Sequence, residues 1–355
     1  MLRIGPKIAA PAALAALLAV AALPAARGAG SDPAGRGDLT PEAREAVRAG
    51  VEWLIDRQNA DGSWLTNGTT GRFPTAVTAL AGLALLAEGN TAYSGPRAAN
   101  VRGAVEFLLR RADSETGLIG SAEGGRPMFG HGYAMLFLAQ VYGSEARPGL
   151  RRRIAEALRR AVALTAESQS ELGGWYYQPD SAEDEGAVTI TQMQGLRACA
   201  NAGLPVPRRT VEGARDYIRA SANPDGGIAY RAGAPGRSRP GITCAAVATL
   251  YAAGIYEGEL VEGALRYALE NTSTRGATPA GGAHFFYSHL YLSQAMYFRG
   301  GRQWRDYFAE IQDWLSSVQR ADGSWNGDYI GTAYGTAVAL LILQLPRHNM
   351  PMFQR

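Results

Sequence analysis

Two histidines and two adjacent carboxylates are the residues of this chain best suited to acid–base chemistry. His131 and His289 each stand at the start of a segment predicted to be an apolar helix, and Asp184 and Glu185 close an acidic run just before another. Imidazoles and carboxylates commonly donate and accept protons in enzymes, so we take these four as candidate catalytic residues. Two alternatives stay open. The histidines could bond neighbouring loops, and the carboxylates could be a solvated run placed favourably before a helix N-terminus.

Aromatic side chains gather in the same segments. A cup of aromatic rings with a few polar groups is typical of a ligand site, and ring faces can stabilise a carbocation or stack on a sugar. Alternatively, the tyrosines plug the centre of the fold and their hydroxyls bond to backbone. The residues that we predict to bind a ligand are Tyr133, Trp175, Tyr176, Tyr177, Arg231, Tyr287 and Tyr291.

These segments belong to a repeat of roughly fifty residues. Gln58-Asn-Ala-Asp-Gly-Ser-Trp64 returns near the other end of the chain as Gln319-Arg-Ala-Asp-Gly-Ser-Trp325. We expect the glycine to permit a left-handed turn at a helix end, the glutamine to bond freed backbone groups and the tryptophan to cover the junction between units. The glycines that mark six units are Gly62, Gly117, Gly173, Gly226, Gly281 and Gly323.

Each unit reads as two helices of different character. The first is amphipathic and rich in arginine, as in Pro41 to Arg57 and Leu150 to Thr165, so one face meets solvent. The second is nearly uncharged and therefore buried all round. The sequence predicts an all-α fold, a closed α6/α6 toroid over residues 40–345, with an open solenoid as the alternative. The predicted second helices are 74–87, 132–142, 188–202, 242–253, 288–298 and 334–345.

The toroid would bring the N-termini of its inner helices together at one mouth. Helix N-termini carry partial positive charge, which favours an anionic group there. The two cysteines, Cys199 and Cys244, fall near opposite ends of their helices and are expected to remain free, buried thiols.

The two ends of the chain differ in composition from the repeats between them. Residues 1–28 resemble a secretory signal peptide, residues 29–39 a flexible spacer, and residues 346–355 a tail. We therefore expect a secreted or periplasmic protein, with contact to a membrane only if the first segment is retained as an anchor. Three of the 35 basic residues lie in that segment, which holds no acid, so the remaining chain has 32 basic and 32 acidic side chains. This balance argues against nucleic acid as a partner.

The aromatic-Leu-x3-Gln-x3-Gly-x-Trp pattern at Trp53 to Trp64 and Trp314 to Trp325 resembles the QW motif of squalene–hopene and oxidosqualene cyclases. The chain is similar to the wider prenyltransferase and squalene oxidase repeat superfamily, and to exported bacterial members with a single toroid. The Asp-x-Asp-Asp acid of the cyclases is absent.

Protein prenyltransferase β subunits in the same superfamily bind zinc through Asp, Cys and His. Cys244 and His289 stand in similar places, but Ile242 occupies the position of the aspartate, so the set of three ligands is incomplete. We predict no metal and no other cofactor.

The resemblance implies an isoprenoid or other hydrophobic ligand in the central cup, with catalysis left open. Two alternatives come from other classes of protein. One is a secreted polysaccharide lyase or glycosidase acting on an acidic glycan, and the other is a non-catalytic scaffold that uses its concave face.

Overall fold

The computed structural model describes residues 38–68, 73–120, 125–233, 236–274, 284–347 and 349. The predicted signal peptide, nearly all of the spacer and most of the C-terminal tail lie outside these residues. Over the described ranges no helix is long and apolar enough to cross a membrane.

The described part of the chain contains twelve α-helices, followed by a short 3-10 helix at Leu345–Arg347. The first helices of the units are α1 (Pro41–Asp56), α3 (Ala98–Arg110), α5 (Pro148–Glu167), α7 (Arg208–Ala220), α9 (Glu259–Asn271) and α11 (Gly301–Ser317). The second helices are α2 (Pro74–Ala87), α4 (Pro127–Ser144), α6 (Gly186–Asn201), α8 (Pro240–Ala252), α10 (Phe285–Arg299) and α12 (Thr332–Leu343).

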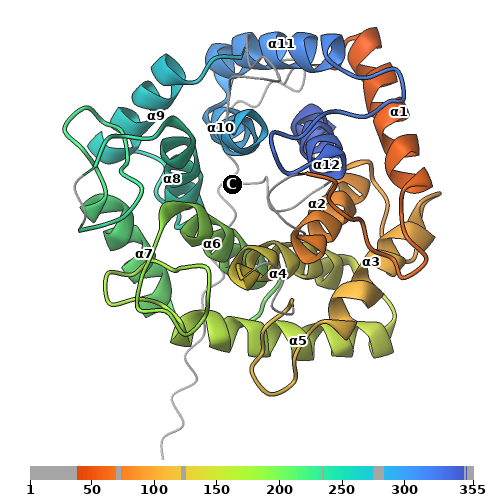
Figure 1. Ribbon diagram of the computed structural model, residues 1–355, viewed down its shortest axis with the longest axis horizontal. Helices are drawn as coiled ribbons and strands as arrows, with labels where there is room; N and C mark the ends of the chain where they lie inside the picture. The colour runs from red at the N-terminus through yellow and green to blue at the C-terminus, as the bar shows by residue number, and fades with distance from the viewer. Residues whose placement is uncertain are drawn as a thin grey trace, which may run out of the picture. The chain divides into compact units, whose positions relative to one another are not determined.

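The helices form two concentric rings. Figure 1 shows the six second helices around the centre and the six first helices outside them. The inner ring is closed because α12 packs against α2, and α1 packs against both α11 and α12. The prediction of a closed α6/α6 toroid is therefore confirmed, and the open solenoid is excluded.

Burial follows the character of each helix. Every residue of α2 is buried, because this helix contacts neighbours on both sides and the outer ring behind it. The outer helix α7 buries only one stripe, which consists of Thr210, Ala214, Tyr217 and Ile218. The boundaries of α2 match the prediction, whereas α4 starts five residues earlier than predicted, because Pro127 is suited to the first turn of a helix.

The glutamine of the repeated pattern joins consecutive units, and the tryptophan bonds to the outer helix of its own unit. The Gln58 amide donates to the carbonyl oxygens of Gly62 and Asn100, at 2.9 Å each, and so links its own turn to the next outer helix. The Trp64 indole N–H donates to the Leu54 carbonyl at 2.8 Å inside the core. The same bonds recur at Gln169 and Trp175 and at Gln319 and Trp325.

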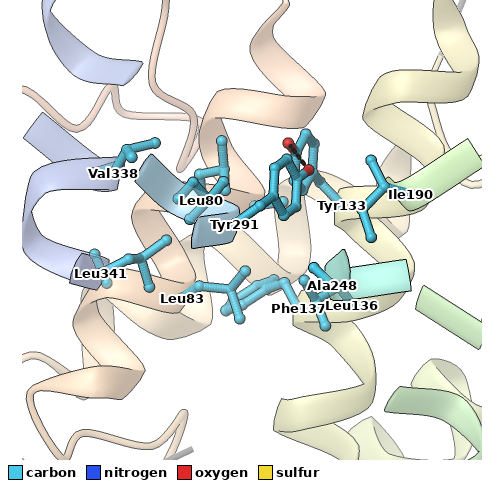
Figure 2. Packing of buried hydrophobic residues seen from close by; sticks show 14 of the residues in the cluster. Leu80, Leu83, Tyr133, Leu136, Phe137, Ile190, Ala248, Tyr291, Val338 and Leu341 are labelled. Atoms are coloured by element: carbon cyan, nitrogen blue, oxygen red, sulfur yellow. Dashed lines mark hydrogen bonds between the residues drawn. The ribbon is translucent and has the colours of Figure 1, made fainter. Parts of the chain in front are cut away.

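The lower part of the ring is filled by its own side chains. Figure 2 shows Tyr133 and Tyr291 side by side above a layer that contains Leu83, Phe137 and Leu341. The two hydroxyl oxygens lie 2.7 Å apart. This packing closes one end of the ring and leaves a cup that opens at the N-terminal ends of the inner helices.

Both cysteines are buried and free, as predicted.

Candidate functional site

A cavity of about 590 Å³ occupies the upper half of the ring. It is formed by the first turns of the inner helices and by the segments that lead into them. Its volume falls within the roughly 300–1,000 Å³ usual for ligand pockets. The residues that line it include Phe73, Val77, Leu80, Arg126, Phe129, Tyr133, Tyr177, Ala187, Tyr230, Arg239, Gly241, Ile242, His284, Phe285, Tyr287, His289, Asp328, Tyr329 and Tyr334.

The wall of this cavity is mainly apolar and aromatic. Phe73, Val77 and Leu80 of the first unit contribute hydrocarbon on one side, and Tyr133 contributes to the floor. The Tyr287 ring also lines the cavity and meets Tyr291 edge-on, with ring centres 5.0 Å apart. The Tyr287 hydroxyl oxygen is buried and has no hydrogen bond partner among the described residues.

Asp328, which the sequence analysis missed, is the carboxylate that lines the cavity. It adopts a left-handed backbone conformation, with φ of 48°, just before α12. Its carboxylate accepts hydrogen bonds from the backbone N–H groups of Phe286 and Tyr287, at 3.3 and 3.4 Å, and so caps α10. Burial raises the pKa of Asp328 to about 6, although the bonds from backbone favour the charged form. No local pattern marked this residue, because the helix that it caps belongs to the preceding unit.

Glu185 lies one layer behind the wall. Its carboxylate caps α6 by accepting from the backbone N–H groups of Ala187, at 2.9 Å, and Val188. Burial raises the pKa of Glu185 to about 7, partly offset by these bonds and by the approach of the Tyr230 hydroxyl. Tyr230 in turn places its hydroxyl 2.5 Å from that of Tyr177, and both tyrosines line the cavity.

Asp184 does not lie beside Glu185 behind the cavity wall. Its carboxylate faces the junction behind the cavity, beside Tyr217 and 3.5 Å from the Ser170 hydroxyl. It is buried, which raises its pKa. The structure therefore separates Asp184 from Glu185 and does not bring them together as two carboxylates facing one cavity.

The two histidines have structural partners on both ring nitrogens. His131 accepts from the Ile119 backbone N–H at its Nδ1, its Nε2 is 3.1 Å from the Thr165 hydroxyl, and it does not line the cavity. His289 does line it, with Nδ1 2.8 Å from the Tyr307 hydroxyl and Nε2 3.1 Å from the Ser273 carbonyl oxygen. Burial lowers the pKa of each histidine to about 4, so both are neutral at neutral pH.

The predicted ligand-binding residues divide into two groups. Tyr133, Tyr177 and Tyr287 line the cavity. Trp175 instead donates its indole N–H to the Thr165 carbonyl of its own unit, and Tyr291 lies in the core beside Tyr133.

Arg231 and Tyr176 form a separate contact away from the cavity. The Arg231 guanidinium bonds the Tyr176 hydroxyl at 3.1 Å and lies 3.3 Å from the Glu183 carboxylate. Neither residue lines the cavity.

Two arginines that the sequence analysis did not single out stand at the mouth of the cavity. Arg126 directly precedes Pro127 at the start of α4, and Arg239 directly precedes Pro240 at the start of α8. The Arg126 guanidinium lies over the Tyr177 ring, 4.5 Å from its centre. The two Arg-Pro pairs could have been found in the sequence, because proline often occupies the first turn of a helix. An arginine just before such a proline lies near the N-terminus of an inner helix, where this cavity is located.

No cluster of three His, Cys, Asp or Glu side chains that could hold a metal ion occurs within the described ranges. The Cys244 thiol lies 3.6 Å from the hydroxyl of Thr272, which lines the cavity, but Cys244 itself is not part of the lining.

The arrangement defines an α/α toroid protein with an aromatic cup at the N-terminal ends of its inner helices. Comparison with protein-family models and with curated protein sequences gives no match. Solved structures with the same toroid architecture do match over most of the chain.

One is the type II terpene cyclase MstE from Scytonema, with 17% identity and a TM-score of 0.58 over 88% of this chain and 98% of that one. Another is the α-1,6-mannanase GH76A of Salegentibacter sp. HEL1_6, with 9% identity and a TM-score of 0.61 over 85% and 98%. A third is a protein from Actinoplanes, with 20% identity and a TM-score of 0.53 over 86% and 99%. At these identities the likeness establishes the fold.

Proposed function

We propose that this protein binds an isoprenoid or similar hydrocarbon ligand in its central cup. The observation that carries the proposal is the cavity itself, which is walled by apolar and aromatic side chains and closed below by the Tyr133–Tyr291 pair. Burying apolar ligand surface in such a site is favourable by roughly 25 cal/mol per Å². The type II cyclase with the same fold has been solved with geranylgeranyl dihydroxybenzoate, an isoprenoid substrate.

A glycosidase is the weaker candidate. Glycoside hydrolysis ordinarily requires two carboxyl groups that flank the bond to be broken. In the described part of this cavity one carboxylate, Asp328, reaches the lining, and Glu185 is held behind Tyr177 and Tyr230. The mannanase with the same fold was solved with α-1,6-mannotriose, so a sugar ligand remains the appropriate comparison in the binding test.

Asp328 is the candidate acid if the bound ligand is also transformed. Its pKa of about 6 keeps part of the population protonated near neutral pH, as proton donation to a ligand requires. The aromatic walls could then stabilise positive charge on the ligand. The Asp328→Asn variant is expected to retain the ligand and lose any conversion of it.

We further propose that the chain is exported and that residues 1–28 are its signal peptide. Sequencing the N-terminus of the mature protein tests this: a start near residue 29 supports export with cleavage, and a start at Met1 contradicts cleavage.

Native mass spectrometry of protein purified from the organism that encodes it tests the binding proposal. We expect a bound species that is released by organic solvent and has the mass of a lipid or isoprenoid. Recovery of unliganded protein that binds mannotriose but no added geranylgeraniol would reverse the assignment.

A further inference from the structure

The inner helices around the cavity differ in what stands at their N-termini. The Glu185 carboxylate caps α6, and the Asp328 carboxylate caps α10. Helices α4 and α8 have no side-chain cap and are each preceded by an arginine, Arg126 and Arg239. Of the six inner helices, α6 and α10 thus carry an anion supplied by the protein at their N-termini, and α4 and α8 are preceded by a cation.

The two arginines have no carboxylate partner among the described residues, unlike several other arginines of the chain. Arg153, for example, forms an ion pair with Glu106 at 2.8 Å. Neither Arg126 nor Arg239 forms an ion pair with any described carboxylate, although both line the cavity. The nearby carboxylates of Glu185 and Asp328 already accept bonds from two backbone N–H groups each.

Other groups at the mouth agree with this distribution of charge. Gly241 and Ile242, in the first turn of α8, line the cavity, and their backbone N–H groups have no acceptor among the described residues. Burial and the charge of Arg239 lower the pKa of His284, which keeps that imidazole neutral. Among the described residues that line the cavity, positive charge therefore comes from the guanidinium groups of Arg126 and Arg239.

We propose that the mouth binds the anionic head, a carboxylate or a phosphate, of an amphiphile whose hydrocarbon part occupies the cup. Guanidinium groups form strong, charge-assisted hydrogen bonds with both kinds of anion. Arg126 and Arg239 would hold the head at the rim, and the apolar wall would hold the chain. The proposal rests on the proposed function, since it specifies the polar end of the same ligand.

The test uses the full chain and three probes with one hydrocarbon part: geranylgeraniol, geranylgeranoic acid and geranylgeranyl monophosphate. Dissociation constants are measured by isothermal titration for wild type and for the Arg126→Gln/Arg239→Gln double variant. Arg151→Gln is the matched control, because Arg151 also lies over a tyrosine ring, that of Tyr142, but does not line the cavity. Thermal unfolding of each variant establishes that it is folded.

At least one anionic probe should bind wild type about tenfold more tightly than the alcohol, and added salt should narrow this difference. The double variant should lose that advantage and keep its affinity for the alcohol, whereas Arg151→Gln should behave as wild type. Tighter binding of the monophosphate assigns a phosphate head, and tighter binding of the acid assigns a carboxylate head.

Equal affinity for all three probes in wild type would overturn this inference and leave the proposed function intact. An unchanged preference for anions in the double variant would also overturn it. Failure of every probe to bind would instead contradict the proposed function, so the two failures are distinguishable.

Discussion

Individual buried ionisable residues make the free energy of unfolding depend on pH. Glu185 has its pKa raised from 4.5 to about 7 by burial, so the folded protein holds this proton more tightly than the unfolded chain does. The resulting stabilisation is fully present below pH 4.5 and is lost as the pH rises through about 7.

The Glu185→Gln variant should remove this dependence on pH. Relative to wild type, its free energy of unfolding should rise by about 3 kcal/mol across that window, because glutamine does not ionise. Urea unfolding at a series of pH values measures the difference. Glu145→Gln is the control with the opposite sign, since the bond from Arg147 lowers the pKa of Glu145. Parallel curves for wild type and Glu185→Gln would contradict the assigned environment.

The effect of removing a tyrosine hydroxyl from the cup on the free energy of unfolding should depend on whether that hydroxyl forms a hydrogen bond. Tyr287→Phe removes a buried hydroxyl that has no partner among the described residues and should raise the free energy of unfolding by about 1 kcal/mol. Tyr133→Phe removes the bond to Tyr291 and should lower it by about 1 kcal/mol. Denaturant unfolding of ligand-free protein checks both values, and equal destabilisation by the two variants would contradict this account.

At the scale of a helix pair, the turns after α1, α3, α5, α7 and α11 each contain a glycine in tight surroundings. Gly62 has φ of +89°, and a Cβ atom there would lie 2.1 Å from the Gly103 carbonyl oxygen of the next unit. Gly203 has a similar φ of +83°, but no atom lies within 4 Å of the position that its Cβ would take.

Gly62→Ala should therefore lower the free energy of unfolding by about 3 kcal/mol, because backbone strain and a steric clash add. Gly203→Ala should lower it by only about 1 kcal/mol, since strain acts alone. Chemical denaturation separates the two cases. Similar values for both variants would show that contact between units contributes little at Gly62.

The same turns explain what could be predicted from the sequence. The repeated Gln-x3-Gly-x-Trp pattern and the uncharged second helices were sufficient for the toroid, because each depends on contacts within one unit or between neighbours. Asp328 was not predictable in this way, because it caps a helix of another unit. His131 and Trp175 lie outside the cavity lining, because the sequence does not distinguish a polar residue that bonds within the core from one that lines a cavity.

At the scale of the whole molecule, ring closure creates the cup. The inner helices have their N-termini at one end, while the Tyr133–Tyr291 pair and the layer beneath it fill the other end (Figure 2). An aromatic site of this kind needs residues from nearly every unit, and the closed ring brings them together (Figure 1).

The most direct test of the central claim is to fill the cup. Ala187 lines the cavity at the start of α6, so Ala187→Trp should occupy the space of the ligand. Ala163→Trp places the same side chain on the exposed face of α5 and serves as the control. Titration with geranylgeraniol should show one site in wild type and in Ala163→Trp, and affinity at least about tenfold weaker in Ala187→Trp. Equal binding by both tryptophan variants would contradict the claim that the central cup holds the ligand.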